Sequence, residues 1–209
     1  MFVSSVMTRE CVCVSAGEPV ARAYSIIRER GFEGLPVLDG DRVVGVVTLW
    51  DIVSRVAATD RVEECFAETR VAEVMAKPPV TVGPDDIIEE AALLMLRHDA
   101  SILPVVDGEG RLVGVLSQSD IFRTLVEALG LERRGTRIAL NIQEKVGELA
   151  RLTAVFSRLG VNIISLVTFE PGRGPADVVA RVETDEPKPV VDTLVEAGFR
   201  VVHVSQVWA

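Results

Sequence analysis

The sequence predicts a mixed α/β protein: two copies of a β-α-β-β-α unit, then a ferredoxin-like β-α-β-β-α-β domain. Three observations predict this fold. Residues 1–129 contain an internal repeat, and each copy holds short runs of Val, Leu and Ile that are typical of buried strands. Residues 137–209 then alternate between strand-like and helix-like patterns.

The repeat is clearest where a strand-like run leads into a helix-like pattern. Residues 43–52 (VVGVVTLWDI) and 112–121 (LVGVLSQSDI) place a glycine, a hydroxyl residue and an aspartate at the same spacing. Upstream, Met7 matches Met75, which lies 68 positions later. A period of this length, with turn residues repeated in place, indicates two copies of one supersecondary unit.

The elements of each unit follow from strand-like runs, a proline at a helix start and glycines at turns. In the first unit we expect strands at Val12–Val14, Leu35–Leu38 and Val43–Val47, and helices at Pro19–Gly31 and Leu49–Ala58. The acidic stretch Thr59–Arg70 is expected to be a connector. In the second unit we expect strands at Val80–Val82, Leu103–Val106 and Leu112–Leu116, and helices at Pro84–His98 and Gln118–Leu129.

The repeated hydroxyl residue and aspartate have a definite chemistry. Thr48 and Ser117 stand at a helix N-cap, where Asp51 and Asp120 complete a capping-box-like pair. The start of such a helix carries unpaired N–H groups and a positive dipole end, which favour an anion. Capping alone is the alternative for either copy taken singly.

The C-terminal region repeats the alternation in a different order. A linker is expected at Gly130–Thr136. Its Arg133 and Arg134 are expected to be solvated, and contact with a ligand phosphate is the alternative. The expected strands are Arg137–Ile142, Asn162–Glu170, Ala176–Thr184 and Val201–Val207, with helices at Glu148–Leu159 and Pro187–Ala197 and a turn at Pro171–Pro175.

Composition narrows the function classes. The net charge of −9 disfavours a nucleic-acid partner, and no apolar run approaches the roughly 20 residues of a membrane span. With no leader evident, we expect a cytoplasmic protein. Cys11 and Cys13 are expected to be small buried hydrophobic residues, and neither His98 nor His203 has a motif-level nucleophile or metal partner. The sequence therefore favours binding over catalysis, with no metal and no required cofactor.

Each repeat resembles a cystathionine-β-synthase (CBS) domain, whose signature is Gly-hydrophobic-hydrophobic-Ser/Thr-x-x-Asp-hydrophobic. The units span residues 1–58 and 70–129, and in tandem they resemble the CBS pair that binds adenosine derivatives. The resemblance implies a regulatory ligand such as AMP, ADP, ATP, NADH or S-adenosylmethionine. Its ribose would meet the motif aspartate and its phosphate the Ser/Thr end.

Mapped by motif, the resemblance implies two clefts. The second cleft would use Thr81, Ile102, Pro104, Ser117, Ser119 and Asp120. The first cleft, expected to bind more weakly, would use Cys13, Gly34, Pro36, Thr48 and Asp51. Trp50 stands where the second copy has Ser119 and can either fill its own cleft or stack on a base; we favour filling.

Residues 137–209 resemble an ACT domain, a small regulatory module that often senses amino acids. Gly147-Glu148-Leu149 and Gly160-Val161-Asn162-Ile163 carry this resemblance. It implies that an amino acid would contact the loop Gln143–Gly147, including Glu144 and Gly147, and Asn162, usually across a dimer interface. Asn162 can alternatively satisfy a turn.

The order of domains resembles the acetoin-utilisation B-type regulators. It implies an adenosyl sensor acting on an unidentified protein partner, with the ACT module serving dimerisation or amino-acid sensing. We expect a homodimer, because a CBS pair exposes apolar helix faces and an ACT sheet exposes an edge. The alternatives are an assembly module with empty clefts and a minor enzyme activity that uses Cys11 or Cys13.

Overall fold

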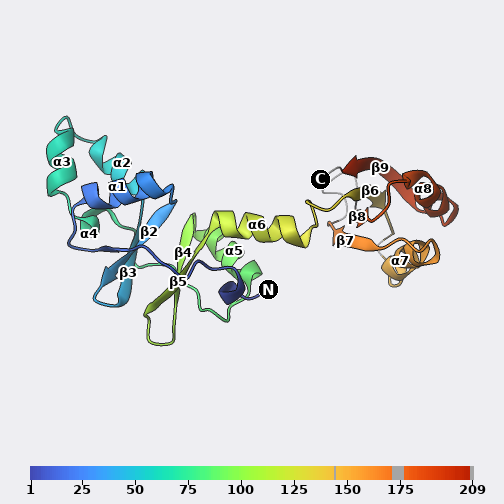
Figure 1. Cartoon of the computed structure of the whole chain (residues 1–209), viewed down its shortest axis with the longest axis horizontal. Coiled ribbons are helices and arrows are strands. Elements are labelled where there is room, and N and C mark those ends of the chain that lie inside the picture. The colour runs from blue at the N-terminus through green and yellow to red at the C-terminus, as the bar shows by residue number, and fades with distance from the viewer. Residues whose placement is uncertain (144, 171–176, 208–209) are drawn as a thin grey trace. The chain divides into compact units, whose positions relative to one another are not determined.

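The computed structural model describes residues 1–143, 145–170 and 177–207 (Figure 1). The chain divides into two compact units, Met1–Phe122 and Arg123–Ala209. The first unit holds both sequence repeats, and each repeat has a hydrophobic core of its own. The mixed α/β fold predicted from the sequence is confirmed. No helix among the described residues is long and apolar enough to cross a membrane.

The first repeat forms a three-stranded sheet covered by helices. Its elements are β1 (Val14–Ser15), α1 (Val20–Arg30), β2 (Gly34–Asp39), β3 (Arg42–Thr48) and α2 (Leu49–Val56). Strand β2 pairs parallel to β1 and antiparallel to β3. Leu35, Val37, Val47 and Ile52 are fully buried between the sheet and the helices. Gly31, at φ 66°, ends α1 in the left-handed conformation that a residue without Cβ adopts readily.

The stretch expected to be a connector is helical instead. It forms α3 (Val62–Glu68), and α4 (Val71–Val74) follows. The prediction from its acidic composition was wrong because Cys65 and Phe66 pack against the first core. The ring of Phe66 meets that of Tyr24 edge-on, at 5.1 Å between centroids.

The second repeat forms α5 (Ile88–His98), β4 (Ile102–Val106), β5 (Leu112–Ser117) and α6 (Gln118–Ala128). Strands β4 and β5 pair antiparallel in a two-stranded sheet. Among the described residues there is no strand at the expected position Val80–Val82; Val82 forms a single parallel bridge to Val105. The side chain of Val82 is nevertheless buried, with Met95, Leu103 and Leu116.

The segment before each repeat packs on the other repeat. Val3, in the 3-10 helix η1 (Val3–Ser5), and Met7 are buried in the core of the second repeat, whereas Val71 is buried in the core of the first. Met7 crosses Gly114 and Met75 crosses Gly45, so closely that a Cβ on either glycine would lie 2.5 Å from the methionine Sδ. The exchanged segments therefore join the repeats into one unit.

The second compact unit is the β-α-β-β-α-β domain predicted from the sequence. Its elements are β6 (Gly135–Asn141), α7 (Glu148–Arg158), β7 (Ile163–Thr168), β8 (Val178–Val182), α8 (Pro187–Glu196) and β9 (Arg200–Val207). The sheet is antiparallel, in the order β7-β8-β6-β9. Its core includes Ile138, Leu140, Leu152, Phe156 and Leu194. The turn expected at Pro171–Pro175 lies outside the described residues.

The expected linker is bound to this second unit. The Ser165 hydroxyl donates to the Leu129 carbonyl at 2.9 Å, and the Arg181 guanidinium donates to the Arg133 carbonyl at 3.2 Å. Arg133 and Arg134 are exposed, as expected, and they also form surface ion pairs with Glu183 and Asp185. The division between the units falls inside α6.

Candidate ligand-binding clefts

Two hollows in the first unit are related by the sequence repeat. The Thr48 cleft brings Thr48 and Asp51 of the first repeat against Pro79, Val80 and Ser101 of the second. The Ser117 cleft brings Ser117 and Asp120 of the second repeat against Cys11, Val12 and Glu33 of the first. Each cleft therefore joins the hydroxyl–aspartate motif of one repeat to the early segments of the other.

The motif geometry is nearly the same in both clefts. In the Thr48 cleft, Asp51 Oδ2 accepts hydrogen bonds from the Thr48 amide at 2.7 Å and the Thr48 hydroxyl at 2.6 Å. In the Ser117 cleft, Asp120 Oδ2 accepts from the Ser117 amide at 2.9 Å and the Ser117 hydroxyl at 2.7 Å. The hydroxyl oxygens in turn accept from the Asp51 and Asp120 amides, both at 3.2 Å. The predicted capping pairs are thus present in both repeats.

The structure regroups the residues that the sequence assigned to the two clefts. Gly34 and Pro36, expected beside Thr48, line the Ser117 cleft. Ile102, expected only beside Ser117, lines both clefts. The reason is the exchange of segments between repeats, which turns the early part of each unit toward the motif of the other.

Four further expected contacts are not among the described residues that line the two clefts. Pro104 is buried within β4, and Thr81 and Ser119 are likewise missing from both linings. Cys13 lines a separate hollow with Arg9, Asp41 and Asp107. Aligning the two repeats shows which residues correspond to each other. It does not show which segments of one repeat pack against the motif of the other.

The two clefts differ most in volume. The Thr48 cleft measures about 500 Å³ and the Ser117 cleft about 110 Å³. Small-molecule sites usually span about 300–1,000 Å³. The sequence favoured the Ser117 cleft as the better site, whereas the Thr48 cleft is the one whose volume lies in this range. Glu33 contributes to the difference, because its Oε1 accepts a 2.6 Å hydrogen bond from the Ser119 hydroxyl at the start of α6.

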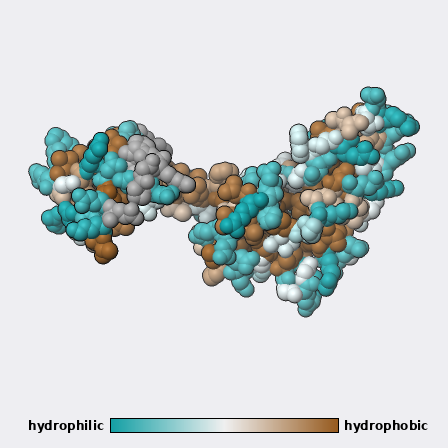
Figure 2. Space-filling view, turned by 180° about the vertical axis from the view of Figure 1, so that it is seen from behind, coloured by the Kyte–Doolittle hydropathy of each residue, from teal (hydrophilic) through white to brown (hydrophobic). Residues whose placement is uncertain are grey.

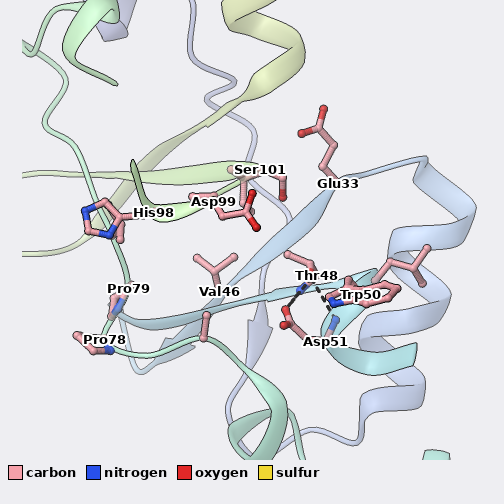
Figure 3. A pocket seen from close by; sticks show the side chains of 15 residues that line it. Glu33, Val46, Thr48, Trp50, Asp51, Pro78, Pro79, His98, Asp99 and Ser101 are labelled. Carbon is pink, nitrogen blue, oxygen red and sulfur yellow. Dashed lines mark hydrogen bonds between the residues drawn. The ribbon is translucent and has the colours of Figure 1, made fainter. Parts of the chain in front are cut away.

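Trp50 does not fill its cleft. Its side chain lines the Thr48 cleft but is 76% exposed, so the expected packing role was wrong (Figure 3). In the first turn of α2 it has no core residues to pack against, and an open aromatic face remains beside the motif. Stacking on a base, the second reading of Trp50, is compatible with this position.

The Thr48 cleft also contains polar residues that the motif analysis missed. Glu33, His98, Asp99 and Ser101 line it, at the ends of α1 and α5 where each helix turns toward its strand (Figure 3). Asp99 is the one non-glycine residue with positive φ among the described residues, at 51°. The aligned position in the first repeat is Gly31. This change from glycine to aspartate between the repeats is the sequence signal that could have pointed to Asp99.

The expected amino-acid contacts of the second unit are not brought together within one chain. Gln143, Lys145 and Glu148 line a hollow of about 550 Å³, while Glu144 lies outside the described residues. Gly147, at φ 93°, starts α7. Asn162 lies beyond the other end of α7, where its amide donates to Glu183 at 3.1 Å. Only a second chain could place Asn162 near this loop.

The described residues show little that resembles catalytic machinery. They contain no group of three or more His, Cys, Asp or Glu that could hold a metal ion. Cys11 and Cys13 are half-exposed rather than buried as expected, because each flanks a surface hollow. Partial burial raises the pKa of both thiols, and the charge of Cys13 adds to the effect at Cys11 as that of Glu18 does at Cys13. Each thiol is therefore less ionised at neutral pH than a free cysteine.

Comparisons with known proteins agree with this architecture. The family model described as CBS domain matches residues 3–58 and 71–127, and the model described as TTHA0829-like ACT domain matches residues 134–205. An inosine-5'-monophosphate dehydrogenase from Korarchaeum cryptofilum is 36% identical over 121 residues. That match covers 56% of this chain but only 23% of the dehydrogenase.

Two solved structures share the fold of the first unit. CBSX2, an Arabidopsis thaliana protein solved in complex with AMP, is 26% identical with a TM-score of 0.54, covering 60% of this chain and 96% of CBSX2. AcuB from Vibrio cholerae, a protein named for acetoin utilization, is 25% identical with a TM-score of 0.55. That match covers 63% of this chain and 95% of AcuB.

Proposed function

This chain belongs to the CBS domain family and ends in an ACT domain, and from that premise we propose that its Thr48 cleft binds an adenosine-containing regulatory ligand. The single observation that carries the proposal is the cleft itself. It measures about 500 Å³ and is built around the hydroxyl–aspartate motif at the start of a helix.

The chemistry of the motif suits a nucleoside. Both bonds that Asp51 receives from Thr48 fall on Oδ2, which leaves Oδ1 to accept from a ribose hydroxyl. Val46, Val80 and Ile102 supply apolar surface for a base, and Trp50 presents an aromatic face at the rim. The related structure of CBSX2 with AMP supports a ligand of this class.

We further propose that the ligand regulates a partner protein instead of undergoing reaction. The dehydrogenase relative is about four times longer than the segment it shares with this chain, so its activity does not define the function of that segment. The ACT module would serve dimerisation or amino-acid sensing. In this proposal Asp51 and Thr48 bind the ligand, and no residue acts as a catalyst.

Calorimetric titration tests the proposal directly. Adenosine, AMP, ADP, ATP, NADH, S-adenosylmethionine and 5'-methylthioadenosine would each be added to the full chain. We expect saturable binding of at least one ligand, with one site per chain, because the Ser117 cleft is too small. No heat and no thermal stabilisation with any ligand would contradict the proposal and favour an assembly module with empty clefts.

Coupling to the ACT module can be tested separately. Helix α6 begins at the Ser117 motif, and residues 129–134, which follow it, are hydrogen-bonded to the second unit. We therefore expect a saturating ligand to change hydrogen-exchange protection at residues 130–134 and 145–147. Inserting about ten Gly/Ser residues after Ala128 should abolish the change at 145–147 without altering affinity. Unchanged protection in the uninterrupted chain would show that the modules are only tethered.

An assembly role has a specific observation in its favour. Leu96 of α5 and Phe122 of α6 are 80% and 65% exposed. Hydrophobic surface is visible along the stretch that contains α6 (Figure 2). Exposed apolar helix faces of this kind indicate a protein interface, and a second copy of the chain is the occupant proposed here.

A further inference from the structure

We propose that the Thr48 cleft selects adenosine derivatives whose 5' substituent is uncharged or positively charged, and that it discriminates against nucleoside polyphosphates. The inference rests on the proposed function and concerns the ligand class of the same cleft. It follows from the charges in the cleft and from the conformation of Asp99.

The ionisable side chains of the cleft are predominantly acidic. Glu33, Asp51 and Asp99 line it together with His98, and none of the described lining residues is Lys or Arg. Sites that hold phosphate groups normally supply Arg or Lys, because those side chains offset the phosphate charge. A triphosphate would here meet several carboxylates in a concave space where water screens charge less well.

The helix start in this cleft does not reverse that balance. The N-terminus of α2 is equivalent to about half a positive charge. The Asp51 carboxylate already lies there, because it accepts a 2.7 Å hydrogen bond from the Thr48 amide. Asp99 is therefore the carboxylate that acts most directly on a ligand substituent.

The conformation of Asp99 brings one of these carboxylates into the cleft. Asp99 follows α5 in the left-handed conformation, at φ 51°, where its counterpart Gly31 has φ 66°. Glycine adopts this conformation readily, whereas an L residue is disfavoured there. Asp99 nonetheless stands at this turn, and its carboxylate lies beside Ser101 in the lining of the cleft (Figure 3).

Glu33 contributes less to this charge, because its carboxylate is turned away from Thr48, Asp51 and Asp99 (Figure 3). Its Oε1 accepts from the Ser119 hydroxyl at 2.6 Å, and its Oε2 is buried without a hydrogen-bond partner among the described residues. A substituent in the cleft does not reach a buried oxygen, so the proposed selection depends mainly on Asp99.

The most direct test compares two ligands that differ in one charge. S-adenosylmethionine carries a sulfonium, and S-adenosylhomocysteine carries a neutral thioether on the same skeleton. By calorimetry in low salt without magnesium, we expect S-adenosylmethionine to bind at least about tenfold more tightly, with ATP the weakest ligand. Tighter binding of AMP or ATP than of S-adenosylmethionine would overturn the inference.

Variants separate a charge effect from a structural one. Asp99→Asn should weaken S-adenosylmethionine several-fold and tighten AMP, while S-adenosylhomocysteine changes little. Asp99→Gly should likewise weaken S-adenosylmethionine and tighten AMP. Glycine adopts the left-handed conformation at this position readily, so the fold should be retained. Asp85→Asn, an equal charge change at an exposed residue outside the cleft lining, is the matched control. Equal shifts for all three ligands would contradict the inference.

The outcomes distinguish this inference from the proposed function. If none of the adenosyl probes binds, including neutral 5'-methylthioadenosine, the proposed function itself fails. If the neutral probe binds but the charge variants leave the preference between S-adenosylmethionine and AMP unchanged, the cleft is a nucleoside site without the proposed charge selection.

Discussion

The two repeats of the CBS pair build the same motif but not the same cleft. The hydrogen bonds between aspartate and hydroxyl residue agree within 0.2 Å, yet the hollows measure about 500 Å³ and 110 Å³. The difference arises where the repeats diverge. Glu33 stands opposite Ser119 at the smaller cleft, whereas the matching positions at the larger one hold Ser101 and the exposed Trp50. The two repeats therefore share the geometry of the motif, whereas the side chains around it differ between the clefts.

The largest expected effect concerns the outer faces of the helices. Leu96 of α5 is 80% exposed, and its counterpart on α1 is Arg28. If α5 forms the proposed two-fold interface, each chain buries one Leu96 there. Leu96→Arg then loses a burial free energy of about 1.5–3 kcal/mol from each of the two chains. Light scattering should then give the monomer mass of 22.6 kDa, while Arg28→Ala leaves the dimer intact. A monomeric wild type at micromolar concentration would rule the dimer out.

The second prediction compares the motif aspartates as ligand contacts. Asp51→Asn removes a charge-assisted hydrogen bond worth about 1.5–3 kcal/mol, so affinity for the adenosyl ligand should fall at least about tenfold. Asp120→Asn should change affinity less than about twofold, because we propose that the ligand occupies the Thr48 cleft. Both variants should lose a similar cap stability of about 1 kcal/mol in thermal unfolding, which serves as the internal control. Equal losses of affinity would show that both clefts bind.

The third prediction concerns the two glycines beneath the exchanged segments. A Cβ at Gly45 would meet Met75, and one at Gly114 would meet Met7, each at 2.5 Å from Sδ. Gly45→Ala and Gly114→Ala should each lower the free energy of unfolding by about 1–3 kcal/mol. Urea denaturation measures this, with Gly17→Ala as the control because its added Cβ meets nothing within 4 Å. Two very different values would mean that the exchanged segments do not contribute equally.

The smallest effect concerns the reactivity of Cys11 and Cys13. Only the first repeat has cysteines at these positions of the alignment. Burial raises the pKa of Cys11 and Cys13, so less thiolate is present at neutral pH than in a free cysteine. Alkylation by iodoacetamide at pH 7.5 should be slower than that of glutathione and should accelerate only as the pH approaches the raised pKa. Mass spectrometry of the labelled peptides resolves the two sites. Fast labelling of either would reopen the possibility of a reactive thiol.

The sequence by itself determined the elements and the motifs. Strand-like runs, Gly31 at the end of α1 and the proline that starts α8 are local signals, and the structure agrees with them. The capping pairs of Thr48 with Asp51 and of Ser117 with Asp120 were also predictable, because their bonds join residues three positions apart. In each case the interactions depend on neighbours in the chain.

Only the tertiary structure decided how these parts meet. The sequence could not show that Met7 packs on Gly114, that Gly34 faces Ser117, or that Glu33 bonds to Ser119, which lies 86 positions away. Nor could it show that Phe66 turns an acidic connector into a helix by packing on Tyr24. The physical reason is that two repeats with matching patterns can pair in more than one way. Burial of apolar segments across the pair, which depends on the whole unit at once, selects the arrangement.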